Sequence, residues 1–431
     1  MRLGGRLAAA IEVLGDIAGR KRPAADALKD WGLSHRFAGS GDRAAIGNIV
    51  YDALRRRRSA GWLFDADTPR AQAFGALMLE WQQTPASLNA QLDGDRFAPP
   101  PLSDDEIHLA QSRRLEDAPA EIRADLPDWC VPLFEEVFGQ DWVAEAAALS
   151  TRPPLDLRVN TLKADRPKVL AELSEVGAAS AALAAQGIRI PPIDGSGRHP
   201  NVQVEPAFQK GWFEVQDEGS QMVAALAAAT PGMQVLDYCA GAGGKTLALS
   251  AAMENRGQIF AHDSDKARLA PIFDRLRRAE SRNVQVLSRL RELEALEGKM
   301  DLVLVDAPCT GSGTWRRRPD AKWRLTDRQL ATRTGEQQSI LDAAKAYVKP
   351  GGRLAYVTCS LFAAENARQI DAFLARDPGF APLDHDRLWS GCFGGHAGAA
   401  YVERDRGISL TPARTGTDGF FFAALVRADA H

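Results

Sequence analysis

The N-terminal part of the chain repeats apolar residues at helical spacing. In residues 3–19 and again in residues 41–54, an apolar side chain returns every third or fourth position, the period of one face of an α-helix. Further along, Ser103 stands directly before the acidic residues 104–106, a combination typical of a helix start. The pattern therefore predicts an all-helical domain over residues 1–125.

The pattern changes after residue 125. Residues 155–159 alternate apolar and polar side chains like a strand, and residues 167–176 return to helical spacing. Residues 187–206 are rich in turn residues and carry short strand signals. This mixture predicts a small α+β module over residues 126–205.

From about residue 212, short apolar runs alternate with helical segments. Each run is nearly continuous, as expected for a strand that helices cover on both faces. The alternation predicts an α/β domain over residues 206–431 with a doubly wound sheet of the Rossmann type, whose ligands bind at the carboxyl ends of the strands. The expected strands are 234–240, 258–262, 284–287, 301–307, 352–357 and 419–426.

Composition places the chain among globular proteins. It has 431 residues, of which 45% are hydrophobic and 25% charged, and a formal net charge of −3. That balance excludes a uniformly basic protein that coats nucleic acid, but it leaves room for a local basic groove. Glu12 and Asp16 interrupt the apolar stretch that a secretory signal would need, and no run of 18 apolar residues occurs. We therefore expect a cytoplasmic protein without a membrane anchor.

Five cysteines and one arginine run are candidates for chemistry. No two cysteines form a C-x-x-C pair, which argues against a zinc site, and their odd number fits a reducing compartment. Residues 55–58 are four consecutive arginines at the end of a predicted helix. A solvated helix end is the preferred interpretation of this run, and a phosphate contact is the alternative. We expect no bound metal and a monomeric chain.

The first strand of the α/β domain is followed by a glycine-rich loop, residues 237–246. The loop ends in Gly-Lys-Thr like a phosphate-binding P-loop, but Cys239 stands where that motif requires glycine. A dinucleotide fingerprint is equally incomplete, because Thr246 stands at its third glycine. S-adenosylmethionine is the third candidate, since Asp263 at the end of the second strand could accept hydrogen bonds from both ribose hydroxyls. A plain tight turn for the loop and a helix N-cap for Asp263 remain open.

Two cysteines follow two of the predicted strands. Cys309 and Cys359 both fall at the carboxyl edge of the sheet, which also holds the glycine loop. A thiolate that adds to C6 of cytosine makes C5 nucleophilic toward an electrophilic methyl group, and a second group must then remove the C5 proton. Ser360, as the start of a helix over residues 361–374, would place Cys359 at a helix N-terminus, which lowers the pKa of a thiol. Asp306 could hydrogen-bond the base at N3 and stabilise charge during the addition.

These motifs together resemble the Sun/Nop family of RNA cytosine-C5 methyltransferases, and within it the bacterial RsmB type. One departure lies in the first motif, where Gly241-Ala242 replaces the usual Ala-Pro. Upstream, residues 127–129 and 157–161 look like the family's small RNA-binding module, and residues 41–55 resemble the NusB-like helical domain of the RsmB type. The motif segments are residues 237–246, 306–313, 317–323, 358–360 with Glu365 and Asn366, and 418–421.

The resemblance implies a role for each matched residue. Cys359 would be the nucleophile on C6, and Cys309 would take the C5 proton so that the product is released. Asp306 would contact the cytosine, with Lys245 orienting it. The stretch 284–289 lacks the acid that the family usually places there to contact the adenine amino group. The methyl donor, S-adenosylmethionine, would be held by Cys239, Ala240, Gly241, Ala242, Gly243, Gly244, Lys245, Asp263 and Asp306.

A basic cluster with flanking tryptophans follows the Cys309 motif. The target base must leave its stack to reach two cysteines in a cleft, so single-stranded or loop RNA is the natural substrate. Because the cluster adjoins the catalytic loop, we interpret it as an RNA contact. The predicted RNA-binding residues are Arg316, Arg317, Arg318, Lys322, Arg324, Arg158 and Asn160.

The expected reaction is methylation of cytosine C5 in RNA through a covalent cysteine–C6 adduct, and the RsmB resemblance favours 16S ribosomal RNA. The same chemistry on transfer RNA is the first alternative. A non-catalytic RNA-binding assembly factor is the second, and the presence of both Cys309 and Cys359 counts against it. A methyltransferase for a small molecule or a protein is the third, and the basic segments count against that.

Overall fold

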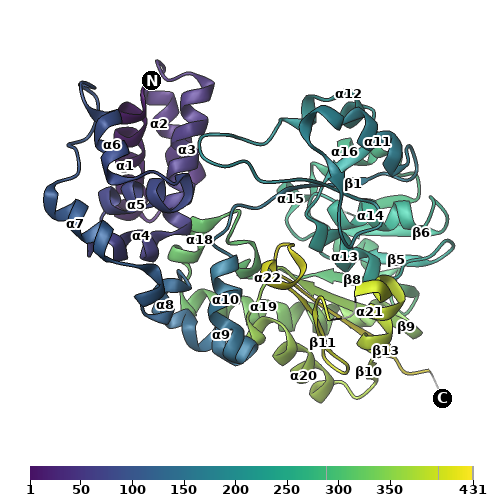
Figure 1. The fold of residues 1–431 in the computed structure, drawn as a ribbon. Helices are drawn as coiled ribbons and strands as arrows, with labels where there is room; N and C mark the ends of the chain where they lie inside the picture. The colour runs from purple at the N-terminus through teal and green to yellow at the C-terminus, as the bar shows by residue number, and fades with distance from the viewer. Residues whose placement is uncertain (288, 397, 430–431) are drawn as a thin grey trace. The chain divides into compact units, whose positions relative to one another are not determined.

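The computed structural model describes residues 1–287, 289–396 and 398–429. The chain forms two compact units whose segments alternate along the sequence (Figure 1). Ser288, part of the stretch that lacks the expected adenine-contacting acid, lies outside the described residues. Unit 1 comprises Met1–Pro153, Pro192–His199 and Trp315–Thr326, and unit 2 comprises Pro154–Pro191, Pro200–Thr314 and Asp327–His431.

Unit 1 is built from helices around one apolar core. The two helices predicted from spacing are confirmed as α1 (Leu3–Arg20) and α3 (Ser40–Arg55). Ser103 caps α7 (Asp104–Ser112) through a reciprocal pair of hydrogen bonds with Glu106. The remaining α-helices of this unit are α2 (Ala24–Ser34), α4 (Arg57–Phe64), α5 (Pro69–Trp81), α6 (Pro85–Leu92), α8 (Ala120–Arg123), α9 (Val131–Phe138), α10 (Trp142–Ala148) and α18 (Pro319–Arg324).

Unit 1 also contains one segment from the motif region. Residues 315–326 follow the Cys309 loop in sequence, yet they belong with the N-terminal helices. Trp323 packs against the helical core, and its indole Nε1 donates to the Leu54 carbonyl at 2.7 Å. The chain therefore passes out of unit 2 directly after the Cys309 motif and re-enters it at the next helix, α19 (Asp327–Ala344).

A small antiparallel sheet opens unit 2, with strand order β2-β3-β1-β4. The predicted strand is β1 (Leu155–Val159), and the predicted helix is α11 (Arg166–Glu172), which ends a little earlier than its spacing suggests. The Asp165 side chain caps this helix by accepting from the Lys168 amide at 2.9 Å. The other strands are β2 (Ala179–Ser180), β3 (Gly187–Ile190) and β4 (Phe213–Val215), and the short helix α12 (Pro206–Gln209) precedes β4.

The large sheet of unit 2 has a parallel half and an antiparallel half. Its order is β11-β12-β13-β9-β8-β5-β6-β7, with β10 paired to β13. Strands β9, β8, β5, β6 and β7 run parallel, which confirms the predicted α/β sheet, whereas the short strands β10, β11 and β12 were not predicted. The strands are β5 (Gln234–Asp237), β6 (Gln258–His262), β7 (Val284–Leu287), β8 (Met300–Asp306), β9 (Val348–Thr358), β10 (Phe380–Pro382), β11 (Tyr401–Glu403), β12 (Gly407–Leu410) and β13 (Phe420–Arg427).

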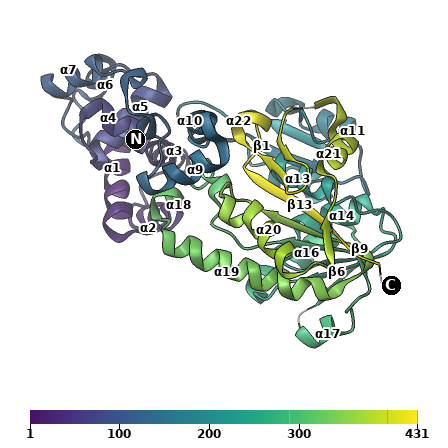
Figure 2. The ribbon, with the colours of Figure 1, turned by 90° about the horizontal axis from the view of Figure 1, so that it is seen from below.

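Alternate residues of the central strands enter two separate cores. In β8, Leu302 and Leu304 pack with residues of the helices on one face, and Val303 and Val305 pack with α19 and α20, which lie side by side in Figure 2. Burying each such side chain contributes about 1.5–3 kcal/mol, so both faces stabilise the sheet edge that carries the motifs. The first face is covered by α13 (Glu218–Leu226), α14 (Gly244–Ala252) and α21 (His385–Phe393), and the second by α19 and α20 (Ala367–Arg376).

Short helices complete unit 2 at its surface. They are α15 (Lys266–Leu269), α16 (Ile272–Ala279), α17 (Leu290–Glu294) and α22 (Pro412–Thr415). Within the ranges that the structure describes, no helix is long and apolar enough to cross a membrane.

Candidate active site

The glycine-rich loop connects β5 to α14 at the carboxyl edge of the sheet. Gly241 and Gly243 have φ angles of 50° and 82°, in the left-handed region that favours glycine. A Cβ added to Gly243 would lie 2.5 Å from a side-chain carbon of Ile272, so this position also requires a residue without a side chain. Glycine at these two positions therefore allows a tight turn that other residues would strain.

Asp263 joins this loop to the end of β6. One of its carboxylate oxygens accepts from the Gly241 amide at 2.8 Å, and the other accepts from the Asp265 amide at 2.8 Å. The helix cap is Asp265, which accepts from the Ala267 amide at 2.9 Å, so the alternative N-cap interpretation applies to Asp265 instead of Asp263. Each oxygen of Asp263 keeps a lone pair, as a carboxylate that receives ribose hydroxyls requires.

Asp237, the last residue of β5, is a buried acid beneath the loop. Its Oδ2 accepts from the Thr246 hydroxyl at 2.7 Å, while its Oδ1 has no hydrogen-bond partner among the described residues. Burial raises the pKa of Asp237 to about 7. Burial also raises the pKa of Cys239, so this thiol stays protonated and lines the loop as an apolar group. An unpartnered acceptor, a small-residue loop and Asp263 fit the amine and ribose groups of S-adenosylmethionine.

Lys245 and Asp306 form an ion pair at the same edge. Lys245 lies in the first turn of α14 and Asp306 ends β8, and the ammonium lies 2.6 Å from the carboxylate. The Lys245 ammonium also lies 5.4 Å from the ring centre of Phe420, in the last motif. The Asp306 side chain is 34% exposed while that of Lys245 is only 8% exposed, so the carboxylate is the accessible member of the pair.

The two motif cysteines lie against each other, with their sulfur atoms 3.4 Å apart. Neither is in a disulfide. The hydrogen bond to Cys359, together with burial, raises the pKa of the Cys309 thiol well above its ordinary value. The Cys309 thiol is therefore held protonated, and its S–H can donate to the Cys359 sulfur. Across the described residues, no group of three or more His, Cys, Asp or Glu side chains could hold a metal ion.

Two motif glycines allow the segments around the cysteines to approach closely. The Gly313 amide donates to the Cys359 carbonyl at 3.0 Å, and the Gly419 amide donates to the Gly313 carbonyl at 2.8 Å. A Cβ added to Gly313 would lie 2.1 Å from the Gly419 carbonyl oxygen, a distance that no side chain can adopt. These glycines thus set the spacing of the two loops and the start of β13.

The predicted helix start at Ser360 is wrong. A 3₁₀ turn at Ala363–Glu365 separates it from α20, which begins at Ala367. The Ser360 hydroxyl donates to the Glu365 carboxylate instead of capping a helix. Cys359 therefore does not lie at a helix N-terminus, and its sulfur has the Cys309 thiol as its neighbour.

Comparison with known proteins shows the family of the chain. Two family models match, 16S rRNA methyltransferase RsmB/F over residues 224–426 and the RsmF/B-like ferredoxin-like domain over residues 126–192. A probable ribosomal RNA small subunit methyltransferase B from Synechocystis sp. is 33% identical, over 70% of this chain and 67% of that protein. Ribosomal RNA small subunit methyltransferase B from Citrobacter koseri is 34% identical, over 72% of this chain and 69% of that protein. The chain belongs to the RsmB/F family.

The structure of NSun6 from Pyrococcus horikoshii with SFG has the same fold. It superposes with a TM-score of 0.60 at 21% identity, covering 71% of this chain and 99% of that one. The family models and the curated relatives confirm the predicted resemblance to the RsmB type of the Sun/Nop family. The predicted fold is also confirmed, a Rossmann-like methyltransferase domain preceded by a helical region and a small ferredoxin-like module. The RsmB/F chain is an RNA methyltransferase by family.

Much of the basic cluster of this RsmB/F chain is buried. Lys322 is 1% exposed, and its ammonium lies 3.4 Å from the Arg55 carbonyl and 3.2 Å from the Ser150 hydroxyl. Arg316 is 3% exposed, and its carbonyl accepts from the Arg55 guanidinium at 2.8 Å. Such burial speaks against phosphate contact by these two side chains. Arg317 and Arg324 are half-buried, Arg324 pairs with Asp320 at 2.8 Å, and Arg318 is exposed.

The two RNA-binding residues predicted in the small module are buried as well. The Arg158 guanidinium donates to the Gln216 side chain at 2.6 Å, and burial lowers the pKa of Arg158 to about 10. Asn160 donates to the carbonyls of Gly211 and Ala279, each at 2.9 Å. Asn160 thus connects the module to α16 inside unit 2, a structural role that its motif did not distinguish from RNA contact.

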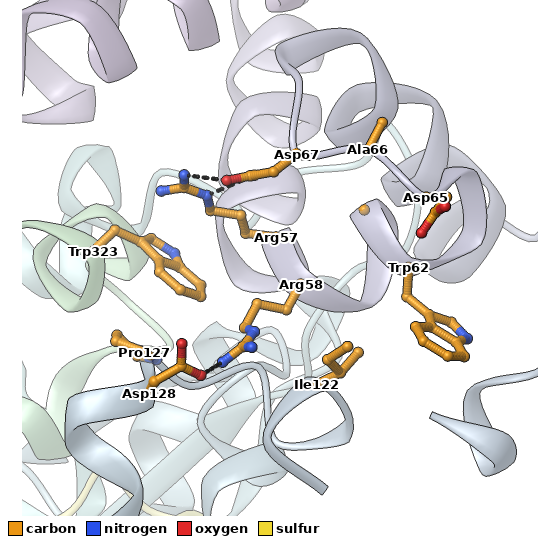
Figure 3. A pocket seen from close by; sticks show the side chains of 11 residues that line it. Arg57, Arg58, Trp62, Asp65, Ala66, Asp67, Ile122, Pro127, Asp128 and Trp323 are labelled. Atoms are coloured by element: carbon orange, nitrogen blue, oxygen red, sulfur yellow. Dashed lines mark hydrogen bonds and ion pairs between the residues drawn. The ribbon is translucent and has the colours of Figure 1, made fainter. Parts of the chain in front are cut away.

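The four-arginine run divides between the core and a surface pocket. Arg55 is 8% exposed and bound to Asp52 at 2.9 Å, which the interpretation as a solvated helix end did not anticipate. Arg57 and Arg58 line a pocket of about 610 Å³, where they pair with Asp67 and Asp128 (Figure 3). Carboxylates already oppose both guanidinium groups, so the pocket has no excess of positive charge for a phosphate.

Proposed function

We propose that this RsmB/F chain transfers a methyl group from S-adenosylmethionine to C5 of a cytosine in RNA, with 16S ribosomal RNA as the target. The observation that carries the proposal is the pair of thiols 3.4 Å apart, Cys309 and Cys359, at the sheet edge that also holds Lys245 and Asp306. A methyl transfer to oxygen or nitrogen needs no thiol, whereas C5 of cytosine needs one to become nucleophilic and a base to lose its proton.

In this proposal Cys359 forms the covalent bond with C6. Before attack, the Cys309 S–H donates to Cys359 and stabilises negative charge on that sulfur. Once Cys359 is bonded to carbon, that charge is gone, and Cys309 can lose its proton to water and act as the base. Once C5 carries the methyl group, the C5 proton passes to the Cys309 thiolate, the electrons of the C5–H bond restore the C5–C6 double bond, and Cys359 leaves as a thiolate.

Asp306 and Lys245 contact the base during the addition. The Lys245 ammonium, 2.6 Å from Asp306, holds the carboxyl group in place. When the thiolate adds to C6, negative charge develops at N3, and a proton passed from Lys245 through Asp306 to N3 would neutralise it. This division of labour agrees with the greater exposure of the Asp306 side chain.

The residues proposed to hold S-adenosylmethionine are Cys239 to Lys245, with Asp263 and Asp306. When bound, the cofactor supplies an electrophilic methyl group. Asp263 would receive the ribose hydroxyls, and the unpartnered Oδ1 of Asp237 would receive a donor from the amino acid part. The NSun6 relative was determined with SFG, an S-adenosylmethionine analogue, which supports this choice.

The choice of target rests on the relatives. Those from Synechocystis and Citrobacter koseri are described as ribosomal RNA small subunit methyltransferases, which favours ribosomal RNA over transfer RNA. The single-stranded target region would meet Arg317 and Arg318, which follow the Cys309 motif in sequence. The division into domains 1–125, 126–205 and 206–431, a monomeric state and a cytoplasmic location stay predictions.

Bisulfite sequencing of total RNA from cells with and without the gene tests the proposal. We expect one protected cytosine in 16S ribosomal RNA to lose its protection when the gene is deleted. Loss of a transfer RNA signal would select the first alternative. If no cytosine changes, the proposed reaction is wrong.

Substitution of each cysteine tests the assigned roles. Cys309→Ala should accumulate a covalent RNA adduct on a denaturing gel, because C5 is methylated but its proton is not removed. Cys359→Ala should form no adduct. Adducts in the reverse pattern would mean that the two roles are exchanged.

A further inference from the structure

Glu365 is a fully buried carboxylate in the 3₁₀ turn after the Cys359 loop. Its Oε1 accepts from the Thr310 amide at 2.8 Å, and its Oε2 accepts from the Thr310 hydroxyl at 2.5 Å. Thr310 directly follows Cys309 in the chain. One carboxylate therefore holds the residue after the first thiol by two hydrogen bonds.

The same carboxylate holds the second thiol loop. Ser360, which directly follows Cys359, donates its hydroxyl to Oε2 at 2.5 Å. Gln337 of α19 completes the set, since its amide nitrogen donates to Oε1 at 2.9 Å and to the Pro308 carbonyl at 3.0 Å. Both loops thus meet on Glu365, and α19 fixes it from a third side.

We infer that Glu365 is a positioning residue that sets the spacing of the two thiols in the proposed methyl transfer to C5. The inference rests on the proposed function, because only a reaction that uses both sulfur atoms makes their distance matter. Glu365 does not touch the base. It acts through Thr310 and Ser360.

The cost of burying this charge supports a specific role. A buried carboxylate loses its hydration, and apolar side chains of similar size could fill the same space without that cost. What they cannot do is accept hydrogen bonds from two loops at once, with four donors on fixed oxygens. The Gly313 amide bonded to the Cys359 carbonyl at 3.0 Å is a second tie between the same loops. Together the two ties join the loop that follows Cys309 to the loop of Cys359.

The charge of Glu365 also acts on Cys309 directly. After the Cys359 hydrogen bond, burial and the Cys359 charge, the nearby Glu365 carboxylate is a further cause that raises the pKa of Cys309. Glu365 therefore favours the protonated state of Cys309, from which the proposed reaction starts.

The decisive variant is Glu365→Gln, which keeps the shape but replaces one acceptor oxygen by a donor amide. We expect kcat for methylation to fall by about 100-fold, because a displacement of about 1 Å at reacting atoms costs that much. The KM for RNA should stay within about twofold, since Glu365 is fully buried and therefore not exposed to RNA. The control is Glu336→Gln, whose side chain is 43% exposed and paired with Arg333 on α19, and it should retain wild-type rates.

A pair of milder variants keeps the test valid if Glu365→Gln does not fold. Thr310→Val removes the hydroxyl that donates to Glu365 and keeps the shape, and we expect kcat to fall roughly tenfold, as for one hydrogen bond to a charged group. Thr310→Ser restores that hydroxyl and should restore kcat. If Thr310 had a structural role alone, Thr310→Val would have a lower melting temperature, but kcat would not differ between Thr310→Val and Thr310→Ser.

Two results would overturn the inference. One is a kcat for Glu365→Gln within threefold of wild type, and the other is equal activity of Thr310→Val and Thr310→Ser. Neither touches the proposed function, which fails only if the wild-type chain transfers no methyl group to cytosine C5 in the same assay. A wild-type chain that methylates C5 beside unaffected variants would refute the positioning role alone.

Discussion

The role of Lys322 can be tested directly, either as a structural anchor in unit 1 or as an RNA contact. Its sequence neighbourhood, rich in arginine and tryptophan, predicts phosphate binding, yet its ammonium is buried in unit 1 against the Arg55 carbonyl and the Ser150 hydroxyl. The informative perturbation is a pair of substitutions, Lys322→Met and Lys322→Ala. The first removes the charge and keeps most of the side-chain volume, and the second removes both.

The structure sets the size of each effect. Burial lowers the pKa of Lys322 from 10.5 to about 8, which corresponds to a cost of about 3 kcal/mol for carrying the charge at neutral pH. Lys322→Met relieves this cost, but it leaves the Arg55 carbonyl and the Ser150 hydroxyl without this donor, which costs about 1.5 kcal/mol for each. We therefore expect Lys322→Met to change the free energy of unfolding by less than about 1 kcal/mol. Lys322→Ala also loses three buried methylene groups and should be less stable by about 2.4 kcal/mol.

Thermal unfolding, RNA binding by fluorescence anisotropy and methylation rates together decide between the roles. An anchor predicts that Lys322→Met binds and methylates RNA like wild type, while Lys322→Ala shows a lower melting temperature. A phosphate contact predicts instead that both variants weaken RNA binding and reduce the salt slope of log K by about 1, with unchanged melting temperatures. The second pattern would refute the structural assignment of Lys322.

Three further predictions follow from other residues. Arg318→Ala, at the exposed cation of the same segment, should weaken RNA binding for all sequences and reduce the salt slope by about 1, which anisotropy at several salt concentrations measures; an unchanged slope would exclude a phosphate contact there. Asp237 has a pKa of about 7 in the fold against an ordinary 3.8, so its protonation stabilises the fold below about pH 4 and that stability is lost as pH rises through 7. Between pH 4 and 8, the free energy of unfolding of Asp237→Asn, measured with urea, should therefore rise relative to that of wild type by up to about 4 kcal/mol. A difference between the two proteins that is independent of pH would contradict this. Gly313→Ala should lower stability by at least about 1–3 kcal/mol because its Cβ meets the Gly419 carbonyl, while Gly335→Ala, on the exposed side of α19 with open space around it, should be neutral or stabilising.

The sheet and its edge could be predicted because period and motif agree there. In β8, apolar residues at every position between Leu302 and Val305 require helices on both faces, and such strands place their carboxyl ends at one edge. Cys309 and Cys359 each follow one of these parallel strands, and they lie close together as the sequence predicts. Strands β10–β12 were missed because three or four residues carry too little periodicity to distinguish a strand from a turn.

The burial of polar residues could not be predicted in the same way. The sequence around a lysine that is flanked by arginines is the same whether the lysine faces solvent or a carbonyl inside the core. Only the packing of residues 315–326 within unit 1 shows that Lys322 is buried. The prediction of a helix start at Ser360 was wrong for a related reason, since the Ser360 hydroxyl donates to Glu365 and caps no helix. A serine suits both tasks, and the partner that prevails is set by tertiary contacts.

The burial of these side chains reduces the number of predicted cations that can contact RNA phosphates. Of the six cations proposed from sequence, Arg316, Lys322 and Arg158 are buried, so the set retains at most three for phosphates. Since each phosphate contact with a single strand contributes about −0.7 to the salt slope, this set accounts for about −2 instead of about −4. These three cations alone would therefore give only a weakly salt-dependent attraction to the RNA backbone. In the proposed function, a target base held at the cysteines and Asp306 would then carry much of the recognition, which would link RNA binding to the proposed methyl transfer.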